Sequence, residues 1–322
     1  MPQVPCCWST FRRYCVISAA RMSPFSKDRL ESITNSLLQP TSASGVHART
    51  GLFEQVIDGL TAVITARRES GTEILRFPPV MSRALVEKSG YLKTFPHLLG
   101  CVSCLHGGET AIRALIEGEA TDPDWVDGLA ATDLVLTPAA CYPLYPLIAA
   151  RGAVPTRGLA FDVASYCFRR EASHEPGRLQ SFRMREYVCV GAPEVALAFR
   201  RRWIARAEEL AQQLALPYKL AAASDPFFGR VGKIMAMSQV EQELKFELLI
   251  PVNSEEHPTA CMSFNYHQDH FGTTWGLHTD AQEVAHTACV AFGLDRLGLA
   301  LFATHGLDLQ KWPASARETL SV

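Results

Sequence analysis

The decisive stretch of this sequence is Phe168-Arg-Arg-Glu171, a polar loop, and then Phe182-Arg-Met-Arg-Glu-Tyr-Val-Cys-Val190. The aromatic and β-branched residues in and around both runs predict two β-strands. The loop, 172–180, holds Ser, His, Glu, Pro, Gly and Arg, which favour a turn. Arginines at both ends of such a hairpin can bind phosphate oxygens in a bidentate manner. A charged surface hairpin would look the same in isolation, so the rest of the chain has to decide between the two readings.

A second informative stretch runs from Thr287 to Phe302. Small residues predict a strand that passes through Gly293 into an apolar helix, and Arg296 lies in the first turns of that helix. The positive end of the helix and the guanidinium both favour a phosphate there. A buried structural arginine is the alternative, and it is less favoured because the phosphate-binding hairpin is also present.

Composition limits the function classes. The 322 residues carry a formal charge of −2, with 48% hydrophobic and 20% charged residues, as in ordinary globular proteins. That charge argues against binding nucleic acid through bulk electrostatics. There is no apolar run of 18 residues, so no membrane span is expected. Ten cysteines in a long chain without a clear signal peptide indicate a reduced, cytoplasmic protein.

Residues 1–49 are expected to form an N-terminal extension and 50–322 a single catalytic domain. Met1 to Arg21 has no signal-peptide pattern and reads either as an arm or as a mis-called start. The polar stretch 23–49 predicts a loosely attached helix and a linker. Leu52–Arg68 and 194–216 have the apolar spacing of helices. Residues 244–252 form an apolar run typical of a central strand, and 133–141 are expected to include a buried strand.

Two groups of side chains are of the kinds that bind metals, and each has more than one interpretation. Cys101 and Cys104 form an isolated C-x-x-C, for which a structural role is favoured over redox chemistry or half a zinc site. His267, Asp269 and His270 could bind a metal, but loop histidines beside aromatic residues are more often hydrogen-bonded scaffolding.

The hairpin and the stretch around Gly293 resemble motifs 2 and 3 of class II aminoacyl-tRNA synthetases. Residues 74–91, a strand broken at Pro78-Pro79 and a short helix, resemble motif 1, which forms the dimer interface in those enzymes. The three stretches occur in the family's order. The resemblance therefore implies an α+β fold, the class II synthetase catalytic fold, with an antiparallel β-sheet flanked by helices.

Cys141, Glu186 and Cys289 lie where atypical seryl-tRNA synthetases of methanogens have a Cys–Glu–Cys zinc site. Two thiolates and a carboxylate fill three tetrahedral positions on Zn²⁺, and the fourth can take a substrate amino group. Cys141 stands where ordinary synthetases have a glutamate. The whole pattern resembles the amino acid:[carrier protein] ligases, which share this catalytic core and lack a tRNA-binding domain.

That resemblance implies activation of glycine or alanine with Mg²⁺-ATP and transfer to the phosphopantetheine of a carrier protein, by a zinc-containing homodimer that does not use tRNA. The choice between glycine and alanine stays open. A free-standing seryl-tRNA synthetase-like enzyme acting on tRNA and an inactive synthetase-like regulator also remain open. The first needs an RNA-binding domain, and the second would be expected to have lost a motif arginine or the metal trio.

The resemblance also implies roles for single residues. Arg169 contacts the α-phosphate and the amino acid carboxylate, Phe182 stacks on adenine, and Glu171 helps to fix the base. Arg178 and Arg296 hold the outer phosphates. The carrier protein is expected to be acidic at its docking face, so the basic cluster Arg201, Arg202 and Arg206 is the candidate docking surface. Arg200 shares a side with Ile204 and is expected to pack inward.

Overall fold

The computed structural model describes residues 27–117, 123–171 and 175–322. Met1–Arg21, interpreted above as an arm or a mis-called start, lies outside these residues. In the described part of the chain, seven strands form one sheet in the order β3-β7-β8-β12-β11-β10-β9. Only β3 and β7 pair in parallel, and every other neighbouring pair is antiparallel. The strands are β3 (Glu73–Arg76), β7 (Leu159–Phe168), β8 (Ser181–Gly191), β9 (Lys219–Ala222), β10 (Lys245–Ile250), β11 (Thr259–Gln268) and β12 (His286–Gly293).

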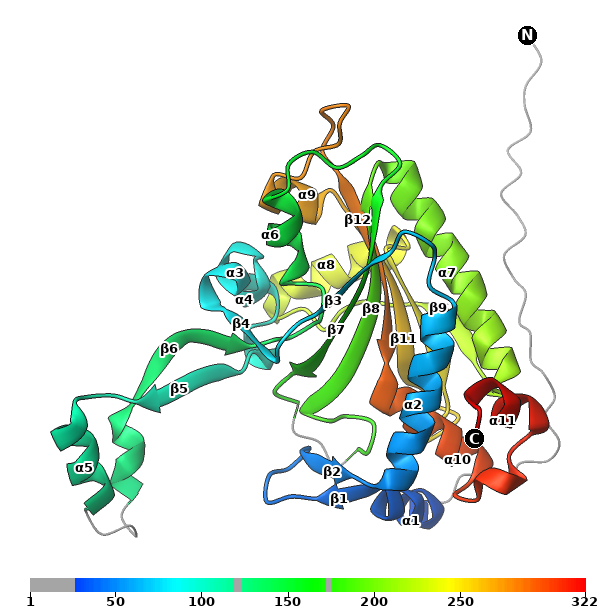
Figure 1. Ribbon diagram of the computed structural model, residues 1–322, viewed down its shortest axis with the longest axis horizontal. Helices are drawn as coiled ribbons and strands as arrows, with labels where there is room; N and C mark the ends of the chain where they lie inside the picture. Colours follow the sequence, from blue (N-terminus) through cyan, green and yellow to red (C-terminus); the bar gives the residue numbers. More distant parts are fainter. Residues whose placement is uncertain (1–26, 118–122, 172–174) are drawn as a thin grey trace.

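One face of the sheet is covered by long helices, which lie on the same side of it in Figure 1. They are α2 (Gly51–Ala66), α7 (Pro193–Gln213) and α10 (Leu294–His305), and α1 (Lys27–Leu37) and α11 (Ala314–Leu320) extend this layer. Phe199 and Trp203 of α7 are buried in it, as their spacing predicts. Leu37 is fully buried in the same cluster. Helix α1 is therefore packed into the core, and the expectation of a loosely attached helix was wrong for it.

The opposite face carries the shorter helices α6 (Leu144–Ala149) and α9 (His270–Trp275). Because side chains of a strand alternate between the two faces, each central strand supplies both layers. In β8, Tyr187 and Cys189 pack under the long helices, whereas Val188 and Val190 face α6 and α9. Glu186 has the same parity as Val188 and Val190, so it also lies on the face of α6 and α9.

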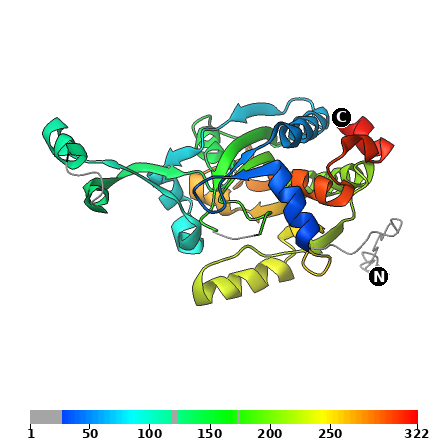
Figure 2. The same cartoon turned by 90° about the horizontal axis from the view of Figure 1, so that it is seen from below.

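A three-stranded sheet of order β4-β6-β5 stands apart from the main sheet. It consists of β4 (Val80–Ser82), β5 (Cys101–Leu105) and β6 (Leu129–Leu136). Between β4 and β5 the chain forms α3 (Arg83–Lys88), α4 (Tyr91–Thr94) and the turn η1 (Pro96–Leu98). Figures 1 and 2 show β5 and β6 projecting from the body with α5 (Glu109–Glu117) and η2 (Pro123–Gly128) at the far end. Strand β6 is mostly exposed, and of its residues only Val135 is buried. The predicted strand at 133–141 is therefore only partly buried: Leu134 is exposed because β6 leaves the main sheet, whereas Val135, Thr137 and Cys141 are buried.

The strand–helix junction at Gly293 is tied to the hairpin by a buried carboxylate. Asp295, in the first turn of α10, accepts hydrogen bonds from the backbone N–H of Arg183 at 2.6 Å and from Arg49 Nε at 2.7 Å. It also pairs with the Arg183 guanidinium at 2.9 Å. Since Asp295 is almost fully buried, these bonds fix the start of α10 against β8. The two sequence stretches that decided the fold are thus locked together.

Candidate active site on the face of α6 and α9

The residues Cys141, Glu186 and Cys289 converge on one face of the sheet. Glu186 lies opposite Ala291 in the β8–β12 ladder, and Cys289 lies opposite Val188, two residues along the same ladder. Cys141 comes from the turn before α6, and its backbone N–H donates to Glu186 Oε1 at 3.1 Å. All three side chains are buried. The fold therefore brings these three positions together from distant parts of the sequence.

The three groups perturb one another's ionisation. A hydrogen bond with Cys289 raises the pKa of the Cys141 thiol well above its usual value, and burial adds to this. The same hydrogen bond lowers the pKa of Cys289. Burial, followed by the charge of Cys289, raises the pKa of Glu186 to about 8. Perturbed groups of this kind in a cleft are typical of functional sites.

Two further side chains, from β11, reach Cys289. Asn265 Nδ2 lies 3.3 Å from Cys289 Sγ, and His267 Nε2 lies 3.8 Å from it. His267 Nδ1 is 2.9 Å from Thr287 Oγ1, so the ring is held at both nitrogens. Sequence reasoning overlooked Asn265 and gave His267 a scaffolding role. The sequence feature that could have identified Asn265 is the alternation of Ser263, Asn265 and His267 along β11, because a period of two places them on one face of the strand.

The donor set fits zinc chemically, since two thiols and a carboxylate are ligands that Zn²⁺ accepts. Across residues 27–117, 123–171 and 175–322, however, no three Cys, His, Asp or Glu side chains stand around one point as a ready metal site. Cys141 and Cys289 instead hydrogen-bond to each other. The zinc ligands thus stay a prediction.

The residue Arg169 lies just after β7 at the other end of this face. Its Nε donates to the carbonyl of Pro138 at 3.1 Å, and its guanidinium lies 5.5 Å from the centroid of the Phe182 ring. Burial disfavours its charge, but nearby Tyr91, Cys167, Asp225 and Glu171 raise the pKa of Arg169 overall. The guanidinium therefore stays charged.

The other predicted ATP-binding residues surround the loop that follows Arg169. Arg296 Nε donates to the carbonyl of Gly177 at 2.8 Å, and its Nη1 donates to the carbonyl of Ala260 at 3.0 Å. Arg178 pairs with Glu175 at 2.7 Å and lies 3.6 Å from Glu171. Arg296 also interacts electrostatically with Arg169, Glu171 and Arg178. The structure thus gathers Arg169, Glu171, Arg178, Phe182 and Arg296 in one region, and their contacts with ATP stay a prediction.

A partly buried group of ion pairs, within electrostatic range of Arg169, was not anticipated from the sequence. Lys245 Nζ lies 2.5 Å from Asp225 Oδ1 and 3.0 Å from Glu247 Oε1. Gln239, on α8 (Gly229–Glu241), bonds both to the backbone N–H of Asp225 and to its carboxylate, at 2.7 and 2.9 Å. The Asp225 carboxylate in turn interacts electrostatically with Arg169. These contacts attach α8 to the border of the site.

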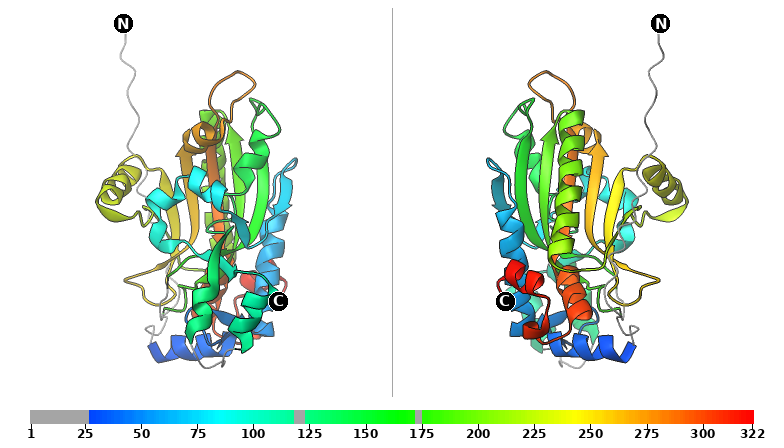
Figure 3. Two further views of the ribbon diagram at one scale, coloured as in Figure 1. Left: turned by 90° about the vertical axis from the view of Figure 1, so that its left-hand side faces the viewer. Right: turned by 90° about the vertical axis from the view of Figure 1, so that its right-hand side faces the viewer.

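Helix α8 has no counterpart among the predicted elements, and Figures 2 and 3 show it outside the β9 edge of the sheet. It presents an exposed apolar face with two basic residues beside it. We call this face the α8 surface; its residues are Phe228, Arg230, Val231, Lys233, Ile234, Met235, Met237 and Val240.

The predicted docking arginines lie elsewhere. They are on α7, whose apolar side packs under the face of the sheet opposite Cys141 and Cys289. Arg202 and Arg206 both pair with Glu69, at 3.3 and 2.7 Å, while Arg201 is exposed. Arg200 packs over Phe246 and donates to the carbonyl of Glu243, as expected for an inward-facing residue.

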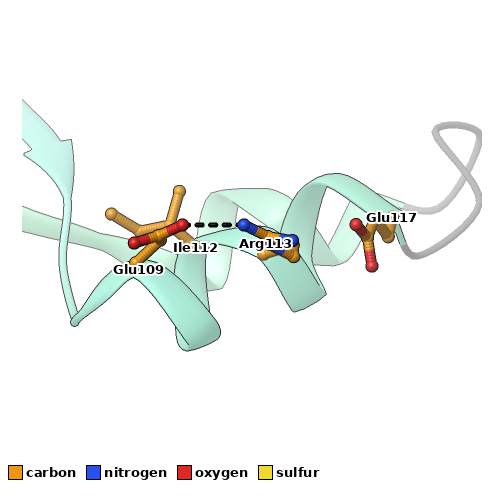
Figure 4. A pocket seen from close by; sticks show the side chains of 4 residues that line it. All are labelled: Glu109, Ile112, Arg113 and Glu117. Carbon is orange, nitrogen blue, oxygen red and sulfur yellow. Dashed lines mark hydrogen bonds and ion pairs between the residues drawn. The ribbon is translucent and has the colours of Figure 1, made fainter.

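Two remaining features lie on the projecting elements α5 and β5. The hollow on α5 is an open surface lined by Glu109, Ile112, Arg113 and Glu117, in which Arg113 pairs with Glu109 at 2.7 Å (Figure 4). Cys101 and Cys104 are exposed free thiols on β5. No helix within the described ranges combines the length and apolar character needed to cross a membrane.

Comparison with known proteins decides the family. The chain is 57% identical, over 300 residues, to amino acid–[acyl-carrier-protein] ligase 1 of Bradyrhizobium diazoefficiens, and the match covers 93% of this chain and 92% of the relative. The chain belongs to the amino acid–[acyl-carrier-protein] ligase family. No family model matches it.

This ligase is also distantly similar to the enzymes that the sequence motifs suggested. A type-2 serine–tRNA ligase of Methanopyrus kandleri is 27% identical over 198 residues, 58% of this chain and 37% of the relative. A crystal structure of A. aeolicus tRNASec in complex with M. kandleri SerRS superposes with a TM-score of 0.80 at 21% identity, covering 94% of this chain and 62% of that chain. The ligase therefore has the class II synthetase catalytic fold, as predicted.

Proposed function

We propose that this ligase activates a small amino acid, glycine first and alanine second, with Mg²⁺-ATP and transfers it to the phosphopantetheine thiol of a carrier protein. The observation that carries the proposal is the convergence of Cys141, Glu186 and Cys289 on the face that ends at Arg169. This arrangement supports a pocket with a group for the amino end of the substrate and a group for its carboxylate. The preference for glycine follows from the family resemblance.

In the first step, a carboxylate oxygen of the amino acid attacks the α-phosphorus of ATP and pyrophosphate leaves. Arg169 is fixed by Pro138 and by the Phe182 ring, so its guanidinium is preorganised for the negative charge on both reacting groups. Arg296 and Arg178 hold the outer phosphates in this proposal, where positive charge stabilises the departing pyrophosphate. Phe182 and Glu171 contact the adenine, and the Mg²⁺ ligands are not assigned.

Zinc, when bound by Cys141, Glu186 and Cys289, supplies a Lewis-acidic position for the amino group of the substrate. The protein's own contribution is to bury the three donors and to hold them with the Cys141 N–H, Asn265 and His267. Such supporting contacts orient metal ligands and tune their affinity. Because one end of the proposed pocket binds an amino group and the other binds a carboxylate, the pocket would select a substrate that carries both groups side by side.

In the second step, the thiolate of phosphopantetheine attacks the carbonyl carbon of the adenylate, a thioester forms and AMP leaves. Two surfaces are candidates for the carrier protein. Arg201, Arg202 and Arg206 are the prediction from charge, and the α8 surface is the second candidate. The position of α8 favours the second, because Gln239 and Asp225 attach it beside Arg169, whereas α7 covers the opposite face.

Assembly and location complete the proposal. We propose a homodimer formed through the motif 1 region, where the edge strand β3 exposes Ile74. The catalytic domain is proposed to span 50–322, with 1–49 as an extension. A cytoplasmic location is supported by the free state of all cysteines within the described residues. The mass of the particle in solution, measured by light scattering, tests the dimer.

The deciding experiment is a two-part assay. Pyrophosphate exchange into ATP is measured with glycine, alanine and serine, and then transfer of the labelled amino acid is measured to a phosphopantetheinylated carrier protein and to tRNA. We expect exchange with glycine or alanine and label on the carrier protein alone. Faster exchange with serine would overturn the substrate, label on tRNA would overturn the acceptor, and a lack of exchange with all three would overturn the activity.

A further inference from the structure

The residue Tyr91 carries a hydroxyl that the fold leaves without a partner. It starts α4 and is 4% exposed, and its hydroxyl forms no hydrogen bond with any described residue. Its ring is held firmly: it meets Tyr142 edge-on at 5.6 Å and Phe95 at 5.2 Å between centroids. Buried polar groups in native proteins are nearly always hydrogen-bonded, and an orphan is costly. Other buried atoms of the described residues, such as Tyr145 Oη and Trp275 Nε1, also lack a partner, so it is the position of Tyr91 that makes its hydroxyl a candidate ligand contact.

The segment around Tyr91 forms a wall beside the catalytic end of β7. The carbonyl of Leu98 accepts a hydrogen bond from the backbone N–H of Arg170 at 2.9 Å. A Cβ placed on Gly100 would come within 2.6 Å of the Phe168 ring, so the chain after η1 lies directly on the strand end that precedes Arg169. Tyr142, which touches Tyr91, is the neighbour in sequence of Cys141. Tyr91 thus lies beside the residue that follows Cys141 and within electrostatic range of Arg169.

The charges around the Tyr91 hydroxyl agree with that placement. Burial raises the pKa of Tyr91 to about 12, and Arg169, Glu171, Cys167 and Asp225 all act on it electrostatically. The hydroxyl consequently keeps its proton at neutral pH and can only serve a ligand as a hydrogen-bond donor or neutral acceptor. Next to a fixed guanidinium, the ligand atoms that need a donor are anionic oxygens.

We propose that the Tyr91 hydroxyl is a substrate-binding group, which donates a hydrogen bond to the carboxylate of the amino acid, or to the phosphate oxygens of its adenylate, held by Arg169. This inference rests on the proposed function and gives a binding role to the last residue of the motif 1-like stretch 74–91, a residue to which the sequence assigned no role. Because the donor would already be desolvated and fixed, it orients the carboxylate for attack on the α-phosphorus. It also explains why the fold tolerates a buried hydroxyl without a partner.

The test is Tyr91→Phe, which removes the hydroxyl and keeps the ring contacts with Tyr142 and Phe95. Removing an orphan group should leave the melting temperature equal to that of the wild type or higher. Loss of a hydrogen bond to a charged ligand should raise the KM for glycine in pyrophosphate exchange, or lower kcat, by about 10- to 100-fold. A purely structural tyrosine would not combine unchanged stability with this kinetic loss.

The matched control is Tyr266→Phe. The hydroxyl of Tyr266 is paired with His286, and its ring packs in the core under the long helices, away from the site face. This variant should lower the melting temperature and leave the KM for glycine unchanged. Exchange that is unaffected in Tyr91→Phe would overturn the inference, as would a loss confined to the transfer to carrier protein. Absence of exchange in the wild type would overturn the proposed function and this inference together.

Discussion

The backbone N–H of Cys141 donates a hydrogen bond to the carboxylate of Glu186 at 3.1 Å, across 45 residues of sequence. This bond holds the turn before α6 against the middle of β8 and places the Cys141 thiol beside Cys289. A carboxylate buried beside two thiols has little use in a structural core, where it is expensive to bury. The bond therefore holds together the three groups that we propose to lie at the amino end of the substrate.

Zinc content is expected to depend on this group. Metal analysis should find about one zinc per chain, and Cys141→Ser should lower it sharply because a thiolate ligand is lost. Cys167→Ser is the matched control, since Cys167 is also buried on this face but has no place in the group. Zinc that survives in Cys141→Ser and disappears when Cys101 and Cys104 are replaced would show that the metal belongs to β5.

Adenylate formation is expected to require Arg169. Replacing it by Ala removes a fixed positive charge from the reacting phosphate, and the rate of pyrophosphate exchange should fall by about 100- to 1,000-fold. Arg296→Ala should also reduce exchange strongly, because this arginine holds the loop at Gly177 as well as the predicted phosphates. Arg170→Ala is the control, since its side chain is exposed. Near-normal exchange in both Arg169→Ala and Arg296→Ala would refute the assignment.

Transfer to the carrier protein should separate the two docking candidates. Replacing Ile234 and Met237 by Ser on the α8 surface should raise the KM for carrier protein and leave pyrophosphate exchange unchanged. Both side chains are exposed, at 66% and 64%, so these changes should not disturb the core. Leu147→Ser, at an exposed apolar position on α6, is the control.

The α7 candidate predicts a different result. Reversing Arg202 and Arg206 to Glu should then raise the KM for carrier protein, most strongly at low salt, because exposed charges are screened. This double variant also loses both ion pairs with Glu69, so its melting temperature should be measured alongside. Unchanged transfer in the α7 variant, with impaired transfer in the α8 variant, would assign docking to α8.

Stability should depend on the buried carboxylate Asp162, which lies 2.6 Å from Arg185 and 3.2 Å from Arg76. Burial alone would raise the pKa of Asp162, but the hydrogen bonds and charges of these arginines lower it overall. Its contribution is therefore complete above the unfolded pKa of about 3.9 and is lost as the pH falls through the folded value.

Asp162→Asn should cost roughly 3–5 kcal/mol at pH 7, because it leaves Arg185 buried without its counter-charge. Urea unfolding at a series of pH values measures this, and the difference from the wild type should shrink in acid. Asp58→Asn, at an exposed position on α2, should change the free energy of unfolding by no more than about 0.5 kcal/mol. A pH-independent difference would contradict the ionic explanation.

The sequence by itself determined the central hairpin, the junction at Gly293 and the helices α2 and α7. Each of these depends on a local pattern: alternation in strands, apolar spacing in helices and an arginine at a fixed distance from a glycine. It also singled out Cys141, Glu186 and Cys289, but only through resemblance to a family, because no local spacing links residues so far apart. Their meeting on one face follows from the ladder that aligns β8 with β12.

Only the tertiary structure decided which side of the sheet each element covers. The spacing of Phe199 and Trp203 shows that one side of α7 is buried, yet it cannot reveal that this helix lies across the sheet from Cys289. The apolar residues of α8 would read as core in any local pattern, and only the packing leaves them exposed. The sequence could not show that the hydroxyl of Tyr91 lacks a partner, since that depends on the residues that surround it. Local patterns show which side of a helix or strand is buried, whereas a site is made of residues from several elements that the tertiary fold brings together.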